Sequence, residues 1–256
     1  MNVACCQFDI AWEDKPANYA RVERHVREAQ LAQGTLLLLP EMFATGFSMN
    51  ADSIAEAVDG PTAQFVAKLA RENGLYVLAG LVIKSDERSS QPRNEALLFN
   101  PSGQQLCRYA KVHRFSFAGE HEHYAAGATP VSCTIEGWKV QPTICYDLRF
   151  PELFRASNVR GAELICVIAN WPAARDSHWL ALLKARAIEN QAYVAAVNRC
   201  GRDPNGEYSG HSQIITPRGE VIEDAGEVEG VIQAELDLEE VREYRAKFPA
   251  LNDVRP

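Results

Sequence analysis

The sequence predicts a layered α/β fold in which two mixed β-sheets pack together and helices cover their outer faces. Early in the chain, short apolar runs alternate with segments of helical periodicity, and later runs are joined by hairpin turns. About twelve runs have strand character, which is too many for one small twisted sheet. The hairpins also exclude an all-parallel arrangement, so two packed mixed sheets are expected.

Helices are expected where apolar residues recur with a period of three to four. Pro61 and Pro151 are typical of the first residues of helices, and Gly34, Gly74 and Gly161 stand where helices should stop. The expected helices cover residues 16–33, 62–73, 151–159, 177–190 and 238–247.

The expected strands share a high content of Val, Ile, Leu and aromatic residues. They cover residues 3–8, 35–39, 76–83, 96–100, 104–110, 131–135, 139–144, 164–169, 193–198, 213–216, 221–223 and 231–235. Turn sequences at residues 100–103 and 216–219 predict two hairpins, and the polar segment 85–93 predicts an exposed loop.

Composition narrows the class of protein. A chain of 256 residues with 46% hydrophobic residues predicts a globular protein, which we expect to be one domain over residues 1–256. Its net charge of −8 argues against nucleic acid and anionic membranes as partners. The seven cysteines include no CxxC pair, and neither a signal peptide nor a membrane-spanning apolar run is recognisable. We therefore expect a reduced, cytoplasmic protein.

Four polar side chains come directly after apolar runs, where ligands collect in open α/β folds. They are Glu41, Lys111, Cys145 and Asn170. Taken singly, each has an ordinary explanation, since free cysteines are commonly core residues and charged residues at strand ends are commonly solvated. Together they suit amide hydrolysis, because a carboxylate can take the thiol proton while an ammonium stabilises the developing oxyanion.

Other chemistries have less support. The sequence contains no GxGxxG, no GxxxxGK[ST] and no GxSxG motif. His121 and His123 lie close together on an expected loop but lack the HExxH pattern of zinc hydrolases, so we expect no metal. A metallohydrolase and a catalytically silent, partner-binding scaffold remain as alternatives, and the complete Cys–Glu–Lys set argues against the scaffold.

Several motifs carry a resemblance to a known family. They are LLPEMF at residues 38–43, YAKVH at 109–113, CYDLRFPE at 145–152, NWP at 170–172, ARAIEN at 185–190 and REYR at 242–245. With these motifs in this order, the chain resembles the nitrilase (carbon–nitrogen hydrolase) superfamily over essentially its whole length. The segments AGEHEHY at 118–124, ANWPA at 169–173 and AIENQAY at 187–193 are most similar to its bacterial omega-amidase branch.

The resemblance implies a four-layer α-β-β-α sandwich that dimerises through helical faces. It also implies hydrolysis of the terminal amide of short 2-oxo acid monoamides, such as 2-oxoglutaramate and 2-oxosuccinamate, without a cofactor. Another hydrolase of the superfamily, acting on an N-carbamoyl amino acid, an aliphatic amide or a nitrile, is the nearest alternative.

The resemblance assigns roles to individual residues. Cys145 would be the nucleophile, Glu41 the general base, and Lys111 with the backbone N–H of Tyr146 the oxyanion donors. A second glutamate belongs near this triad; Glu120 fits its place in the loop. Glu122 is the competing candidate.

A 2-oxo acid monoamide carries a carboxylate, so its pocket needs a cation. Arg149 is the first choice, since it follows the nucleophile by about one helical turn and a guanidinium grips a carboxylate with two hydrogen bonds. An ion pair with Asp147 or Glu152 is the ordinary alternative for Arg149. Arg114 and Arg175 are the other candidates for the carboxylate site. Asn170, Phe43, Phe117 and Trp171 complete the expected substrate pocket, although each aromatic ring could equally be a core residue.

Overall fold

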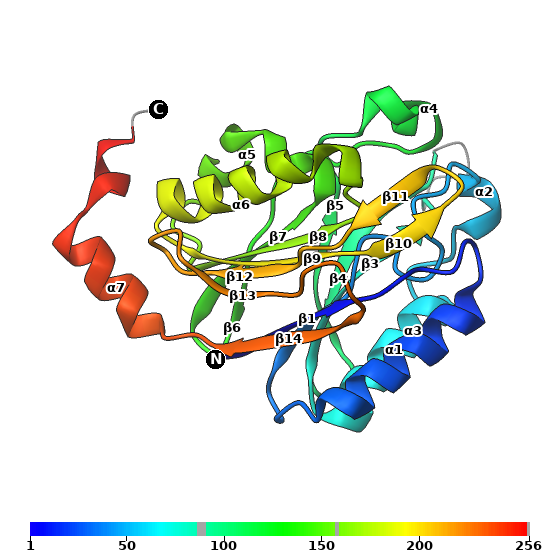
Figure 1. Ribbon diagram of the computed structural model, residues 1–256, viewed down its shortest axis with the longest axis horizontal. Helices are drawn as coiled ribbons and strands as arrows, with labels where there is room; N and C mark the ends of the chain where they lie inside the picture. Colours follow the sequence, from blue (N-terminus) through cyan, green and yellow to red (C-terminus); the bar gives the residue numbers. More distant parts are fainter. Residues whose placement is uncertain (86–90, 157–158, 255–256) are drawn as a thin grey trace.

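The computed structural model of the protein describes residues 1–85, 91–156 and 159–254. Two six-stranded sheets pack face to face, with helices outside each of them, and the two layers of sheet are visible between the helices in Figure 1. The predicted α-β-β-α sandwich with two mixed sheets is therefore confirmed.

The first sheet has the strand order β14-β1-β2-β3-β4-β5. Its strands are β1 (Asn2–Gln7), β2 (Leu36–Leu38), β3 (Tyr76–Ile83), β4 (Arg93–Phe99), β5 (Gln105–Ala110) and β14 (Gly230–Glu235). Strands β1, β2 and β3 are parallel, whereas β4, β5 and β14 join by antiparallel pairing. The parallel centre places the carboxyl end of β2 inside the sheet rather than at its edge.

The second sheet has the order β13-β12-β9-β8-β7-β6 and again a parallel centre, formed by β7, β8 and β9. Its strands are β6 (Cys133–Ile135), β7 (Trp138–Ile144), β8 (Leu164–Ala169), β9 (Tyr193–Asn198), β12 (Gln213–Ile215) and β13 (Val221–Asp224). A separate hairpin of β10 (Cys200–Asp203) and β11 (Gly206–Ser209) was not expected from the sequence. Both predicted hairpin turns do join antiparallel strands.

The helices cover the sheets from outside, with α1 and α3 on one side and α5 and α6 on the other (Figure 1). The α-helices are α1 (Lys15–Ala29), α2 (Ala51–Ile54), α3 (Pro61–Asn73), α4 (Glu120–His123), α5 (Pro151–Arg155), α6 (Asp176–Asn190) and α7 (Leu238–Lys247). Short 3₁₀ turns cover Ser116–Ala118 (η1), Cys145–Arg149 (η2), Ala173–Arg175 (η3) and Ala250–Asp253 (η4). Among the described residues, no helix has the length and apolar content needed to cross a membrane.

Some predicted boundaries were wrong. Helix α1 ends at a left-handed Gln30 rather than near Gly34, because Gly34 already donates a hydrogen bond to Gly74 O at the entry to β2. Helix α5 ends at Arg155, and residues 157–158 of the longer predicted helix lie outside the described residues. The expected loop at 85–93 also lies partly outside them, and its last residue is the first of β4. His121 and His123 lie on α4 rather than on a loop.

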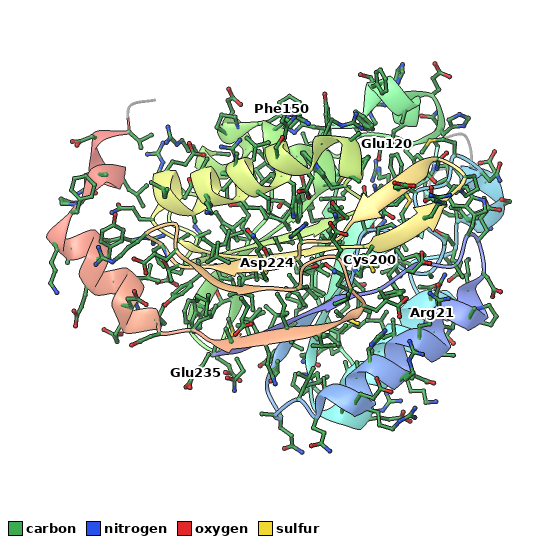
Figure 2. All side chains as sticks on the ribbon, viewed as in Figure 1. Arg21, Glu120, Phe150, Cys200, Asp224 and Glu235 are labelled. Atoms are coloured by element: carbon green, nitrogen blue, oxygen red, sulfur yellow. The ribbon has the colours of Figure 1, made fainter. Side chains whose placement is uncertain are left out.

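The core follows the alternation of side chains along the strands. In β2 and the residue after it, Leu36 and Leu38 face the second sheet, while Leu37 and Leu39 pack under α1 and α3. All four side chains are fully buried. The side chains fill the space between the two sheets (Figure 2), so the strand ends are held on a rigid frame.

Candidate active site

Glu41, Lys111 and Cys145 come together although they lie far apart in the sequence. Glu41 follows β2, Lys111 follows β5, and Cys145 follows β7. Lys111 Nζ donates to Glu41 Oε1 at 2.8 Å. Asn170, after β8, links this pair to the thiol: its N–H donates to Glu41 Oε2 at 2.9 Å, and its carbonyl oxygen lies 3.8 Å from Cys145 Sγ. The four residues predicted from strand ends therefore form one cluster.

Cys145 sits on a sharp turn between a strand and a helix. Its φ of 46° is left-handed, a conformation that costs energy for a residue with a side chain. Asp147 stabilises the turn, because its carboxylate accepts a hydrogen bond from Ile144 N–H at 3.1 Å. The turn leaves Cys145 9% exposed, in the lining of a cavity.

The position of Glu41 is fixed on both carboxylate oxygens and by its backbone. Asn94 Nδ2 donates to Oε1 at 2.7 Å, and Asn170 Nδ2 donates to the Glu41 carbonyl. Gly80 on β3 allows the backbone of Glu41 to approach closely, since a Cβ at Gly80 would lie 2.5 Å from Glu41 Cα. Met42, with a φ of 45°, then turns the chain away from the strand direction.

Of the two candidate second glutamates, Glu120 is the one beside the triad. It is fully buried, and Lys111 Nζ donates to its two oxygens at 3.0 and 2.9 Å. Asn94 and the Phe115 N–H also donate to it. Glu122, by contrast, has 68% of its side chain exposed on α4. The site thus contains a lysine between two buried carboxylates.

These buried charges set the resting state of the thiol and the ammonium. Burial raises the pKa of Cys145 well above its ordinary value, and the Glu41 charge raises it further, whereas Lys111 lowers it. Burial would lower the pKa of Lys111, but Glu120 and Glu41 outweigh that cost and raise it. Both shifts favour the protonated forms, a neutral thiol and a charged ammonium.

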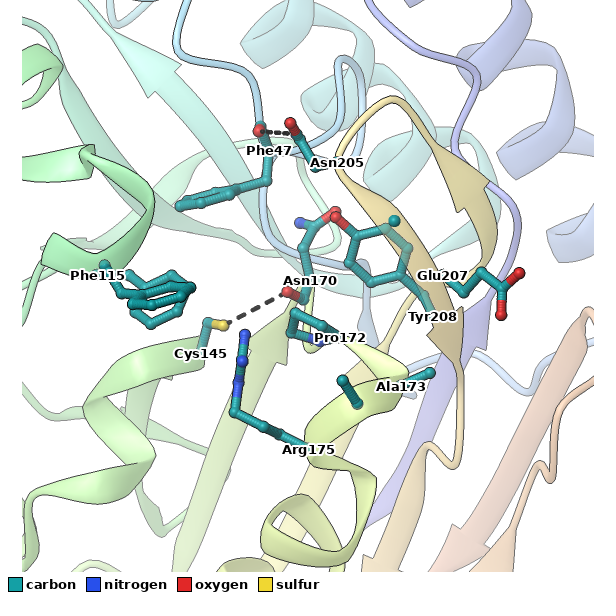
Figure 3. A pocket seen from close by; sticks show the side chains of 13 residues that line it. Phe47, Phe115, Cys145, Asn170, Pro172, Ala173, Arg175, Asn205, Glu207 and Tyr208 are labelled. Carbon is teal, nitrogen blue, oxygen red and sulfur yellow. Dashed lines mark hydrogen bonds between the residues drawn. The ribbon is translucent and has the colours of Figure 1, made fainter.

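Cys145 opens into a cavity of about 660 Å³. Its walls come from Phe47 and Phe115 on one side and from the β10–β11 hairpin, residues 205–208, on the other (Figure 3). Phe117 also lines the cavity, with its ring 5.8 Å from that of Phe115. A hydrogen bond joins the hairpin to the segment that carries Phe47, because Asn205 Nδ2 donates to Phe47 O at 3.1 Å. A cavity lined by aromatic rings with a few polar groups is typical of a small-molecule site.

The structure places Arg175, rather than Arg149, in this cavity. Figure 3 shows the Arg175 guanidinium extending toward Cys145, and it lies against the rings of Phe115 at 5.3 Å and Phe117 at 5.9 Å. Within residues 1–85, 91–156 and 159–254, no carboxylate forms an ion pair with it. Arg175 therefore has its charge available for a bound anion.

Arg149 and Arg114 do not line the large cavity. Arg149 lines a smaller cavity of about 20 Å³, which Cys145 and Arg175 also line, and its guanidinium lies 4.8 Å from the Trp171 ring and 3.2 Å from His178 Nδ1. The ion pair of Arg149 with Asp147 or Glu152 is not formed among the described residues. Arg114 donates to the carbonyl oxygens of His121 and Tyr124.

The expected aromatic walls divide into three cases. Phe117 lies at the cavity rim with 85% of its surface exposed. Trp171 and Tyr146 line the smaller cavity together with Arg149. The expectation for Phe43 was wrong: it is fully buried in the core under α1 and α3, because the left-handed Met42 turns it away from the site.

Comparison with known proteins decides the family. The sequence profile described as carbon–nitrogen hydrolase matches residues 2–246. The chain belongs to this carbon–nitrogen hydrolase family. Its fold is that of a hydrolase of carbon–nitrogen bonds.

Known carbon–nitrogen hydrolases resemble the chain from end to end. Omega-amidase YafV of Escherichia coli K12 is 42% identical, covering 99% of this chain and 96% of its own length. The 2-oxoglutaramate amidase of Bacillus subtilis is 37% identical, covering 99% and 97%. The structure of XC1258 from Xanthomonas campestris, a CN-hydrolase superfamily protein with an arsenic adduct in its active site, superposes with a TM-score of 0.92 at 33% identity, covering 100% and 97%.

His121 and His123 were the residues on which the metallohydrolase alternative depended. In the part of the chain that the structure describes, no three His, Cys, Asp or Glu side chains are grouped to hold a metal ion. His121 lies on the surface of α4 with 45% of its side chain exposed. The arrangement gives no support to the metallohydrolase alternative.

Sequence reasoning missed two parts of the hydrolase site. One is Asn94, which donates to Glu41 and Glu120 from the middle of the molecule; nothing in its strand sequence signals this role. The other is the β10–β11 hairpin, whose two-residue turn is Pro204-Asn205. Pro and Asn are common turn residues, so this wall of the cavity could have been predicted.

Proposed function

We propose that the chain is an omega-amidase that hydrolyses 2-oxoglutaramate and 2-oxosuccinamate to the dicarboxylate and ammonia. The carrying observation is that Cys145 and Arg175 line one cavity, and that Asn170, which also lines it, joins Cys145 to the buried Glu41–Lys111 pair. A substrate with an amide at one end and a carboxylate at the other matches those two features. The names of the similar proteins support this substrate class.

In the proposed first step, Glu41 takes the thiol proton as Sγ attacks the amide carbon. This direction of transfer suits a thiol whose pKa is raised by burial, because the thiolate need exist only as the bond forms. Lys111 Nζ and the Tyr146 backbone N–H hold the oxyanion. Glu41 then returns the proton to the leaving ammonia, and a thioester remains on Cys145.

In the second step, Glu41 activates a water that attacks the thioester and releases the acid. Glu41 passes the proton of that water to the departing Cys145 sulfur, which restores the thiol. Glu120 serves both steps because its negative charge offsets the free-energy cost of burying the Lys111 ammonium. The ammonium therefore stays protonated and in place. These steps need only the chain's own side chains and one water, so we propose that no cofactor takes part.

Selectivity for acid-bearing amides is expected to depend on Arg175. In Arg175→Lys the charge stays but the forked geometry is lost. Since a hydrogen bond to a charged group is worth about 10- to 150-fold, kcat/KM for 2-oxosuccinamate should fall by that factor per lost bond. A neutral amide of equal length should change less than about threefold, because it makes no such bond.

Arg149→Lys is the matched comparison for this test. Its side chain lies in the smaller cavity, so the acid-selective loss should be smaller than in Arg175→Lys. A larger acid-selective loss in Arg149→Lys would make Arg149 the carboxylate site. Equal losses on acid and neutral amides in both variants would contradict the proposed acid preference.

A substrate panel tests the function itself. Ammonia release is measured with the two 2-oxo acid monoamides, an N-carbamoyl amino acid, an aliphatic amide and a nitrile. The expected result is a kcat/KM for the monoamides at least tenfold above all others, together with an acyl adduct on Cys145 in the intact mass spectrum. A higher value for another compound would assign the chain to that other branch of carbon–nitrogen hydrolases.

We also propose that residues 1–256 form one hydrolase domain that acts as a cytoplasmic homodimer, without nucleic acid or membrane partners. Exposed apolar side chains on the helical side of the second sheet support dimerisation. Ile188 on α6 is 51% exposed and Phe248, just after α7, is 59% exposed. A mass near twice 28.4 kDa in sedimentation equilibrium would agree with this, and a monomer at working concentration would contradict it.

A further inference from the structure

The proposed triad is divided between the two sheets. Glu41 and Lys111 follow strands β2 and β5 of the first sheet, whereas Cys145 follows β7 of the second. The distance between the ammonium and the thiol therefore depends on how the two sheets are placed against each other. Apolar packing between sheets has no directional preference, so polar contacts are needed to fix this distance closely.

Asp147 makes such a contact between the sheets. It is fully buried on the turn that carries Cys145, and one of its oxygens accepts the Ile144 N–H. From the other sheet, Tyr109 Oη donates to Oδ2 at 2.6 Å, and the His113 N–H donates to Oδ1 at 2.9 Å. Asp147 thus accepts hydrogen bonds from Tyr109 and His113, which lie two residues before and two residues after Lys111.

Two further features keep this contact in one arrangement. Burial and the neighbouring Asp147 charge raise the pKa of Tyr109 well above its ordinary value, so its hydroxyl remains a donor. His113 adds a second contact, with Nδ1 lying 3.0 Å from Asp147 Oδ1 while its ring stacks on Phe150 at 3.8 Å. Neither Tyr109 nor Asp147 lines either cavity at Cys145, so neither touches a bound substrate.

We propose that Asp147 is a positioning residue that sets the place of the Lys111 ammonium relative to the Cys145 thiol across the two sheets. Its hydrogen bonds to Tyr109 and His113 hold the lysine segment, and its hydrogen bond to Ile144 holds the nucleophile turn. This role of Asp147 rests on the proposed cysteine chemistry, because the distance between the Lys111 ammonium and the Cys145 thiol matters only if Lys111 holds the oxyanion.

Tyr109→Phe tests this role with a minimal change. The ring remains in the core, and the hydroxyl that binds Asp147 is removed, together with its weaker contact to the Val112 N–H. Removal of one oxyanion donor costs about 10²–10³-fold, so a displaced donor should lower kcat by about 5- to 50-fold. KM should stay within about twofold, since the cavity walls are unchanged.

Tyr193→Phe is the matched control. Tyr193 is also buried and also donates its hydroxyl to a carboxylate, that of Glu240, but it joins β9 to α7 away from the site. Both variants should lose stability, and the control should keep the parent kcat. A drop in melting temperature without a drop in kcat for Tyr109→Phe would make Asp147 purely structural and overturn the proposal.

Asp147→Asn gives a second test that does not depend on the substrate. The rate at which iodoacetamide alkylates Cys145, followed on the Cys145 peptide by mass spectrometry, is measured against pH in folded protein. The profile should move to higher pH in Asp147→Asn and Tyr109→Phe, because Lys111 then favours the thiolate less, and an unmoved profile would overturn the proposal. If Asp147→Asn and Tyr109→Phe keep the parent kcat while Cys145→Ala is inactive, the positioning role alone is refuted. If Cys145→Ala is active, the proposed chemistry itself is refuted.

Discussion

Replacing Cys145 by alanine is expected to abolish measurable amide hydrolysis while the protein folds as before. The thiol is the nucleophile of the proposed reaction, and neither Glu41 nor Asn170 beside it carries a sulfur that could form the thioester. Alanine tolerates the left-handed φ of 46° as well as cysteine does, so the turn should persist. Activity is measured as ammonia release, and folding as the thermal unfolding curve.

Cys133→Ala is the matched control for this substitution. Cys133 is a free, half-buried thiol on β6, outside the cavity. Its removal should leave kcat within about twofold of the parent value. Retention of more than a few per cent of kcat in Cys145→Ala, with a parent-like unfolding curve, would contradict the cysteine mechanism.

Glu41→Gln is expected to lower kcat by about 10²–10⁴-fold, which is the usual contribution of general acid–base catalysis. The amide keeps the length of the side chain but cannot take the thiol proton. It also replaces one acceptor oxygen with an NH₂ group. Because Asn94, Lys111 and the Asn170 N–H all donate to the carboxylate, at least one of these hydrogen bonds is lost in the variant. The measurement is the steady-state rate over a pH series.

Glu122→Gln is the corresponding control, because Glu122 lies exposed on the neighbouring helix α4 and should be replaceable without loss of kcat. If Glu41→Gln changed kcat by less than tenfold, the base would have to be another carboxylate. Glu120 would then be the candidate, and its own glutamine variant would show the larger loss.

Strand ends were the most predictable part of the site. Glu41, Lys111, Cys145 and Asn170 each follow an apolar run, and the parallel centres of both sheets bring such ends together. The strands themselves were predictable because their apolar runs are long and buried on both faces. Local sequence therefore predicts both the frame and the residues that come directly after it.

Substrate contacts were less predictable because they depend on loop geometry. Counting residues from the nucleophile favoured Arg149, yet the turn at Cys145–Arg149 directs that guanidinium onto Trp171. Arg175 reaches the cavity from η3, a segment whose path depends on the packing of its neighbours. Phe43 was misplaced because no periodic pattern foresees a left-handed residue at Met42.

Because the proposed triad is divided between two sheets, its residues are synthesised well before they are brought together. A ribosome delivers Glu41 and Lys111 before Cys145, and β14, which pairs with β1 along six residues, emerges later still. Until the sheets have stacked, the nascent chain carries a thiol with an ordinary pKa of about 8.5 and neither base nor ammonium beside it. In the proposed mechanism, acyl-transfer chemistry therefore begins only with the docking of the second sheet onto the first.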